Sequence, residues 1–159
     1  MRAVQASRAE WSVAALGLLL LGLLFAPWYA VDLPPSVYQY GDPGGYSGWA
    51  TGTVTSIVVA AFSAACLAQA LVLRAVRSPA VGAAWNVGVE WSAIVTVIWI
   101  GARAMWPPDA FLKPGWGLWA SLAVAIAILV ANWLGMRDER EDPALVEAVP
   151  VRPIPPLAR

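Results

Sequence analysis

Glu90 is the residue whose type and position most clearly suggest chemistry. It is the only Asp, Glu, Lys or Arg inside any of four long apolar stretches, and twelve uncharged residues stand on each side of it. A carboxylate at membrane depth costs at least a few kcal/mol unless it is paired, solvated or protonated. Such a group can exchange a proton or hold a cation, so Glu90 is the first candidate for a functional residue.

Three amide side chains are expected to lie near this carboxylate. Counting from the cytoplasmic ends of the apolar stretches, at about 1.5 Å of rise per residue, puts all of them in the inner half of a bilayer. We predict that they form an intramembrane polar cluster consisting of Gln69, Asn86, Glu90 and Asn132.

Two interpretations of this polar cluster remain open. In the functional one, Glu90 exchanges a proton or holds a cation near the cytoplasmic face. In the structural one, Glu90 is protonated or paired with Arg74, and its hydrogen bonds to the amides fix the register of the helices. We favour the structural interpretation, because transport usually needs a relay of ionisable groups and the apolar stretches contain no second acid and no Lys or Arg.

A second candidate site is a group of aromatic residues near the outward ends of the apolar stretches. Such groups can bind lipid headgroups, glycans or a partner protein. The alternative, which we favour, is an interfacial belt whose amphipathic rings simply lie at headgroup level. The candidate outer aromatic patch comprises Trp28, Tyr29, Tyr38, Tyr40, Tyr46, Trp49, Trp106, Trp116 and Trp119.

The chain lacks the residues that most catalytic and metal sites need. It has no histidine, and its only cysteine is Cys66, inside an apolar stretch. A catalytic triad, a Cys/His metal site and a haem site therefore cannot be assembled within one chain. The formal net charge is zero, and no basic surface argues for nucleic acid. We predict a protein that is not an enzyme, that needs no cofactor or metal and that does not bind nucleic acid.

The elements that must position these residues are four predicted membrane-spanning helices. The chain has 159 residues, of which 60% are hydrophobic and only 13% charged, as is typical of an integral membrane protein. A span needs about 20 apolar residues, and the charge-free runs predict helices over 12–29, 49–73, 82–102 and 117–136. The predicted fold class is all-α, an integral membrane four-helix bundle formed by residues 1–136.

Both ends of the chain allow further interpretations. The first apolar stretch follows Arg2 and Arg8 as in a secretory signal, but the bulky Trp28 stands where a cleavage site needs a small residue. Residues 137–159 are charged and then rich in proline, which predicts a short disordered cytoplasmic tail. Alternatively, PxxP spacings such as Pro150 to Pro153 can dock a partner.

Positive charges predict the orientation of the helices. Short loops rich in Lys and Arg stay on the cytoplasmic side. The outward loops contain only Arg103 and Lys113, so both termini are predicted to be cytoplasmic and the protein to lie in the inner (plasma) membrane. The flanks on the cytoplasmic side carry Arg2, Arg8, Arg74, Arg77, Arg137 and Arg140.

The third predicted helix has two contrasting faces. At 3.6 residues per turn, the polar residues of this helix fall on one face and most of its tryptophans on the other. The first face should point into the bundle, and it carries Asn86, Glu90, Ala93, Ile94, Val97 and Gly101. The opposite face should meet lipid or a partner, and it carries Trp85, Trp99, Arg103 and Trp106.

Several short motifs resemble those of uncharacterised four-span membrane proteins from actinobacteria and related high-GC bacteria. The first predicted helix ends in Ala26-Pro27-Trp28-Tyr29, the second begins near Ser47-Gly48-Trp49-Ala50, the fourth begins near Gly117-Leu118-Trp119, and Arg137-Asp138-Glu139 follows it. The resemblance covers residues 16–139. It implies a four-span fold and a bacterial host, and it implies no activity.

Together these observations favour a small integral membrane protein that acts as an accessory or scaffold subunit in the cell envelope. It would contact the lipid bilayer and either a membrane protein partner or further copies of itself. The reason is that a chain with ten tryptophans contains no complete chemical site. The alternative is a homo-oligomeric transporter, coupled to protons or cations, that uses Glu90.

Overall fold

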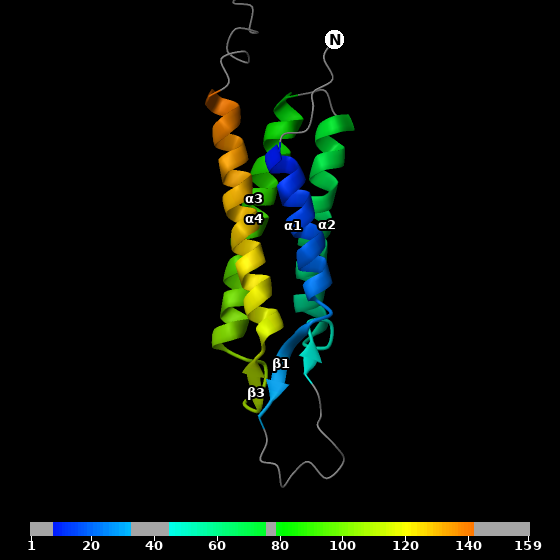
Figure 1. Ribbon diagram of the computed structural model, residues 1–159, viewed down its shortest axis with the longest axis vertical. Coiled ribbons are helices and arrows are strands. Elements are labelled where there is room, and N and C mark those ends of the chain that lie inside the picture. Colours follow the sequence, from blue (N-terminus) through cyan, green and yellow to red (C-terminus); the bar gives the residue numbers. More distant parts are fainter. Residues whose placement is uncertain (1–7, 33–44, 76–78, 142–159) are drawn as a thin grey trace, which may run out of the picture.

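Four helices and a small sheet make up the part of the chain that the structure describes. The computed structural model describes residues 8–32, 45–75 and 79–141. The elements are α1 (Arg8–Leu23), β1 (Pro27–Val31), β2 (Tyr46–Ser47), α2 (Thr53–Ala75), α3 (Pro79–Met105), β3 (Leu112–Pro114) and α4 (Trp116–Glu141). The helices lie side by side, and the sheet lies at one end of them (Figure 1). We call this end the sheet end, and the opposite end, where α1 begins, the helix end.

Three of these four helices are long and apolar enough to cross a membrane. Their apolar parts are Val54–Leu73 in α2, Val81–Met105 in α3 and Trp116–Arg137 in α4. By length and composition, the prediction of membrane-spanning helices is confirmed for these three segments. α1 has 16 residues, which cover about 24 Å, whereas a hydrocarbon core is about 30 Å thick. The first segment is therefore shorter than a span.

α1 ends before the predicted limit of the first span because the chain turns after Leu23. The next three backbone amides, at positions 24–26, donate to carbonyl oxygens three residues earlier, at 3.3, 3.0 and 3.1 Å. Pro27 cannot continue a helix and favours an extended residue before it. The indole Nε1 of Trp28 then donates to the carbonyl oxygen of Leu23 at 2.9 Å. The prediction of a helix over 12–29 is wrong at its end, since 27–29 belong to a strand.

The described structure is mostly helical, as the predicted all-α class requires, but it also contains a three-stranded sheet that was not predicted. β1 is the central strand, and β2 and β3 are its antiparallel neighbours. In the pairing with β3, Tyr29 lies opposite Pro114 and Val31 opposite Leu112. Just beyond the ladder, the backbone amide of Gly115 donates to the carbonyl oxygen of Trp28 at 2.7 Å. The sheet thus joins the segment after α1 to the segments before α2 and α4.

The helices pack through stripes of buried residues spaced alternately three and four apart. α1 packs on α2 and α4, and α3 packs on the same two helices. Residues at this spacing lie on one face of a helix. α1 and α2 approach closely because Gly17 has no side chain: a Cβ added there would lie 2.6 Å from the Cβ of Cys66. The stripe of α4 consists of Leu118, Ser121, Ala125, Ile128 and Asn132.

The other helices also differ from their predicted bounds. α2 begins at Thr53 rather than at position 49, after Gly52 with a φ of +133°, a conformation that mainly glycine adopts. α3 is longer than 82–102 at both ends and begins with Pro79, which suits the first turn of a helix. α4 continues past the predicted end at 136 to Glu141. The charged part of the predicted tail therefore begins as helix, and residues 142–159 lie outside the described residues.

The buried face of α3 is rotated relative to the predicted one. Its buried residues are Asn86, Val89, Ala93, Thr96, Ile100 and Ala104. On the predicted lipid face, Trp106 is exposed, but Trp85 packs against the core. Trp99 donates from Nε1 to the hydroxyl oxygen of Thr55 in α2 at 3.3 Å. The prediction that Trp85 faces lipid or a partner is therefore wrong, and Trp99 is only half-buried, with its Nε1 turned towards α2.

Candidate functional site

Three buried amide side chains lie near the helix end of the structure, one on each of three helices. Gln69 lies near the end of α2, Asn86 near the start of α3 and Asn132 in the second half of α4. Each one belongs to the buried stripe of its own helix. Because α2 and α4 run towards the helix end and α3 runs away from it (Figure 1), these positions reach the same level of the molecule.

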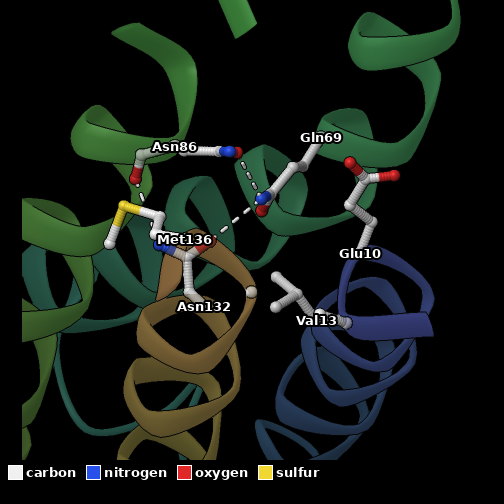
Figure 2. A pocket seen from close by; sticks show the side chains of 8 residues that line it. Glu10, Val13, Gln69, Asn86, Asn132 and Met136 are labelled. Atoms are coloured by element: carbon white, nitrogen blue, oxygen red, sulfur yellow. Dashed lines mark hydrogen bonds between the residues drawn. The ribbon is translucent and has the colours of Figure 1, made fainter. Parts of the chain in front are cut away.

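Hydrogen bonds join the amides to one another and to Glu90. Gln69 Nε2 donates to Asn86 Oδ1 and to Asn132 Oδ1, at 2.9 Å in both cases. Asn132 Nδ2 donates to the backbone oxygen of Asn86 at 3.1 Å and to Glu90 Oε2 at 2.9 Å. Figure 2 shows Gln69 and Asn132 facing each other, with Asn86 beside Gln69 and above Asn132. The structure thus brings together all four residues of the predicted polar cluster.

The pattern of donors fixes the orientation of each amide. Asn132 gives both N–H bonds to oxygen atoms, so its Oδ1 must accept, and Gln69 must offer its nitrogen there. Gln69 Oε1 is then left on the other side of the amide. Gln69 is only 2% exposed, and its Oε1 has no hydrogen-bond partner among the described residues. This buried oxygen is the one acceptor of the amide that the cluster does not use.

A small cavity adjoins Gln69. Its volume is about 10 Å³, which is close to the minimum for one water molecule. The cavity therefore admits a single group of that size and no larger ligand. It is lined by Ala9, Glu10, Val13, Gln69, Asn86, Asn132, Gly135 and Met136.

Glu10 is a residue of this site that the sequence analysis did not include. It lies in the first turn of α1 and lines the cavity beside Val13, across from Asn132 and Met136 (Figure 2). The signal was present in the sequence, because Glu10 directly precedes the first apolar stretch. Its relevance depends on α1 lying against α2 and α4 at the level of Gln69, which a single sequence does not reveal.

The contacts of Glu90 limit what the cluster can do chemically. Glu90 is half-buried, and among the described side chains its hydrogen-bond partner is Asn132. The side chain of Arg74, the predicted ion-pair partner, lies outside the described part of the structure. Amide groups donate and accept hydrogen bonds but do not titrate. The amides can therefore hold Glu90 in place, but a proton cannot pass along them.

The predicted outer aromatic patch is divided by the fold. Trp28 is fully buried and Tyr29 nearly so, so the prediction that they belong to an outer surface is wrong. Tyr38 and Tyr40 lie outside the described residues. The exposed members are Tyr46, Trp49, Trp106, Trp116 and Trp119.

Tyr29 connects the sheet to the end of α3. Its hydroxyl donates to the backbone oxygen of Arg103 at 2.8 Å. Burial raises the pKa of Tyr29 above its usual value near 10, while the positive charge of Arg103 opposes the shift. Tyr29 therefore stays protonated at physiological pH and keeps its role as a hydrogen-bond donor.

Neither metal chemistry nor similarity to known proteins adds a role for the site. Among residues 8–32, 45–75 and 79–141, no group of three or more His, Cys, Asp or Glu side chains could hold a metal ion. No protein-family model, curated protein or solved structure matches the chain.

Proposed function

We propose that this chain is a small integral membrane protein that acts as an accessory or scaffold subunit and binds a partner membrane protein through the outer face of α3. Three helices that are long and apolar enough to cross a membrane support its location. The single observation that supports binding to a partner protein is the position of Trp91 on α3.

Trp91 is exposed in the middle of a membrane-spanning helix. Its side chain is 65% exposed, and it lies about 18 Å from the start of α3 and about 21 Å from its end. Tryptophan prefers the headgroup region, where its N–H finds polar partners and its ring stays apolar. Facing lipid at the bilayer centre, the indole N–H would lack a partner. A helix of another protein can cover the ring and offer an acceptor.

The residues around Trp91 form a stripe along the outer face of α3. Its members follow one another at alternating spacings of four and three, which is the spacing of a helix that packs along another helix. Small residues in such a stripe allow a neighbouring backbone to come close. All are exposed except the half-buried Ala102, and the stripe consists of Ala84, Gly88, Trp91, Val95, Ile98, Ala102 and Met105.

The polar cluster is consistent with a scaffold role. Its hydrogen bonds run between α2, α3 and α4, and each such bond in a membrane contributes about 0.6 to 2 kcal/mol. These bonds hold the three helices in one register. The outer face of α3 is then presented to a partner in a fixed orientation, which lowers the conformational cost of binding.

We also propose that the helices form a four-helix transmembrane bundle in the plasma membrane of a bacterium, with both termini cytoplasmic. Arg8, Arg74 and Arg137 lie at helix termini that point to the helix end, and positive flanks stay in the cytoplasm. α1 is short, but it packs on both α2 and α4. Protein contacts can therefore hold it at membrane depth although its length falls below that of a span.

The partner is tested by removing the indole of Trp91. We expect the wild-type protein, purified from its own membrane in mild detergent, to carry one stoichiometric partner chain in native mass spectrometry. Trp91→Ala should lose most of this partner, because a tryptophan anchor at an interface commonly contributes about 2 kcal/mol or more, roughly a 30-fold change in affinity. Ile57→Ala is the matched control, since Ile57 is similarly exposed on α2, and it should keep the partner.

Three outcomes would contradict the proposal. If the wild-type chain is recovered alone, it is not an accessory subunit of a partner protein. Equal recovery of the partner with Trp91→Ala would mean that the outer face of α3 is not the contact. An assembly that consists only of further copies of this chain would make it a homo-oligomer rather than an accessory subunit.

Transport coupled to protons or cations is a second candidate function. The observation that favours it is the half-buried carboxylate of Glu90, which accepts a hydrogen bond from Asn132 of the same polar cluster. The amides of this cluster border a cavity. In an oligomer, several copies of Glu90 together can supply a pathway that one chain lacks. The small cavity and the amides, which do not titrate, speak against a pathway within one chain.

Glu90→Gln separates the two candidate functions, because it keeps the shape and the hydrogen bond to Asn132 but removes the titration. For an accessory subunit we expect no ion flux from proteoliposomes of the purified wild-type chain, measured with a pH-sensitive dye or a cation electrode. A transporter would give a flux that Glu90→Gln abolishes. Asp109→Asn, an exposed acid at the sheet end, should leave any such flux unchanged.

A further inference from the structure

A hollow on the surface of α3 at the sheet end contains a positive charge that no carboxylate among residues 8–32, 45–75 and 79–141 neutralises. The hollow has a volume of about 190 Å³ and is lined by Trp99, Ala102, Arg103 and Trp106. Among the described residues, no carboxylate forms an ion pair with Arg103, whereas Lys113 at the same end is paired with Asp32 at 2.6 Å. The hollow therefore offers a cation that is available to an external anion.

The guanidinium of Arg103 is held in place by its neighbours. Its central carbon lies 5.6 Å from the centroid of the Trp99 ring, a distance at which a cation is attracted to an aromatic face. The Trp99 ring is itself fixed, because its Nε1 donates to the buried Thr55 hydroxyl at 3.3 Å. An anion that binds here does not have to order a free arginine first.

Hydrogen bonds at the end of α3 reduce the repulsion that its backbone carbonyl groups would exert on an anion in the hollow. The last carbonyl groups of a helix carry partial negative charge. Two of those in α3 already accept hydrogen bonds, from the Tyr29 hydroxyl to the oxygen of Arg103 and from the Trp106 amide to the oxygen of Ala102, both at 2.8 Å. Their lone pairs are partly occupied, and the guanidinium is the dominant charge facing the hollow.

Exposed tryptophans place the hollow at the depth of lipid headgroups. Trp106, on its rim, is 73% exposed, and Trp116 and Trp119 are exposed at the start of α4, at the same end of the molecule. Exposed tryptophans that gather at the ends of spanning helices are typical of the membrane–water interface. At that depth, the most abundant anion is the phosphate group of a phospholipid.

We propose that this hollow, the Arg103 site, binds the phosphate of an anionic phospholipid headgroup. The planar guanidinium can donate two parallel hydrogen bonds to phosphate oxygens, and the Trp106 ring covers the glycerol part of the headgroup. A lipid with a net negative charge is favoured over a zwitterionic one, whose ammonium group would be brought close to Arg103. The proposal rests on the membrane location but not on the partner at Trp91.

Native mass spectrometry in mixed micelles tests the Arg103 site. The purified chain is equilibrated with equal amounts of phosphatidylglycerol and phosphatidylcholine, and the lipids that stay bound are counted. We expect a preference of about tenfold for phosphatidylglycerol, because both lipids offer a phosphate but only phosphatidylcholine brings a second positive charge close to Arg103. Arg103→Gln should abolish the preference, and Trp106→Ala, at an exposed position, should reduce it several-fold without affecting folding.

The control is Lys113→Gln, which removes a positive charge of the same end that is already paired and should leave the preference intact. The proposal is overturned if the wild type binds both lipids equally, if Arg103→Gln retains the preference, or if Lys113→Gln loses as much as Arg103→Gln. Displacement of the lipid by inorganic phosphate would mean that free phosphate is the ligand. A wild-type chain that leaves its cells without detergent would instead contradict the membrane location itself.

Discussion

Trp28→Ala is expected to destabilise the fold by about 3 to 5 kcal/mol, the usual cost of truncating a fully buried large aromatic residue. Trp28 is 0% exposed, and its Nε1 donates to the carbonyl oxygen of Leu23 at 2.9 Å. The ring also packs closely on Gly48, where an added Cβ would lie 2.8 Å from it. The alanine leaves a cavity and removes one of the two hydrogen bonds that the Leu23 carbonyl oxygen accepts. Unfolding by a titration with SDS in mixed micelles, followed by circular dichroism, measures the loss.

Trp106→Ala is the matched control for this prediction, since it removes the same side chain at an exposed position of the sheet end. Exposed substitutions usually change stability by no more than about 0.5 kcal/mol. If both variants lost the same small amount, Trp28 would act as a member of an interfacial belt after all, and the buried junction between α1 and β1 would be wrong.

Trp28 and Tyr29 were predicted at an outer surface but are buried, because hydropathy alone does not show where a helix ends and a buried strand begins. Residues 11–31 are free of charge throughout, and an apolar run of this kind fits a helix that spans the membrane, or a shorter helix followed by a buried strand. Pro27 is the local signal for the second solution. Strands of two, three and five residues are too short to leave a recognisable alternation, and their pairing joins residues far apart in the chain.

The polar cluster was easier to anticipate than the sheet. Gln69, Asn86 and Asn132 are isolated amides in apolar helices, and counting the rise per residue already puts them at one depth. Their alignment along the buried stripes follows from the same helical periodicity. The contribution of Glu10 was missed, because it depends on how α1 packs. The exposure of Trp91 was missed for the same reason: it depends on the rotation of α3, which the sequence pattern predicted incorrectly.

Asn132→Leu is the second change with a large expected effect. Asn132 takes part in three hydrogen bonds, accepting from Gln69 and donating to Glu90 and to the backbone of Asn86. Leucine has a similar size but makes none of them. At about 0.6 to 2 kcal/mol per intramembrane hydrogen bond, and with the side chain of Glu90 left without its amide donor, we expect a loss of about 2 to 4 kcal/mol in the same unfolding titration.

A double-mutant cycle shows whether this loss comes from the cluster. Gln69→Leu removes the partner amide, so the double variant with Asn132→Leu should be more stable than the sum of the single changes predicts, because both halves of their shared bond are gone. Leu134→Ala, at an exposed position of the same helix, should cost about 0.5 kcal/mol or less. Strict additivity of the two cluster variants would mean that the amides are not coupled. If Asn132→Leu lost no more stability than the control, the polar cluster would not be what keeps α2, α3 and α4 in register.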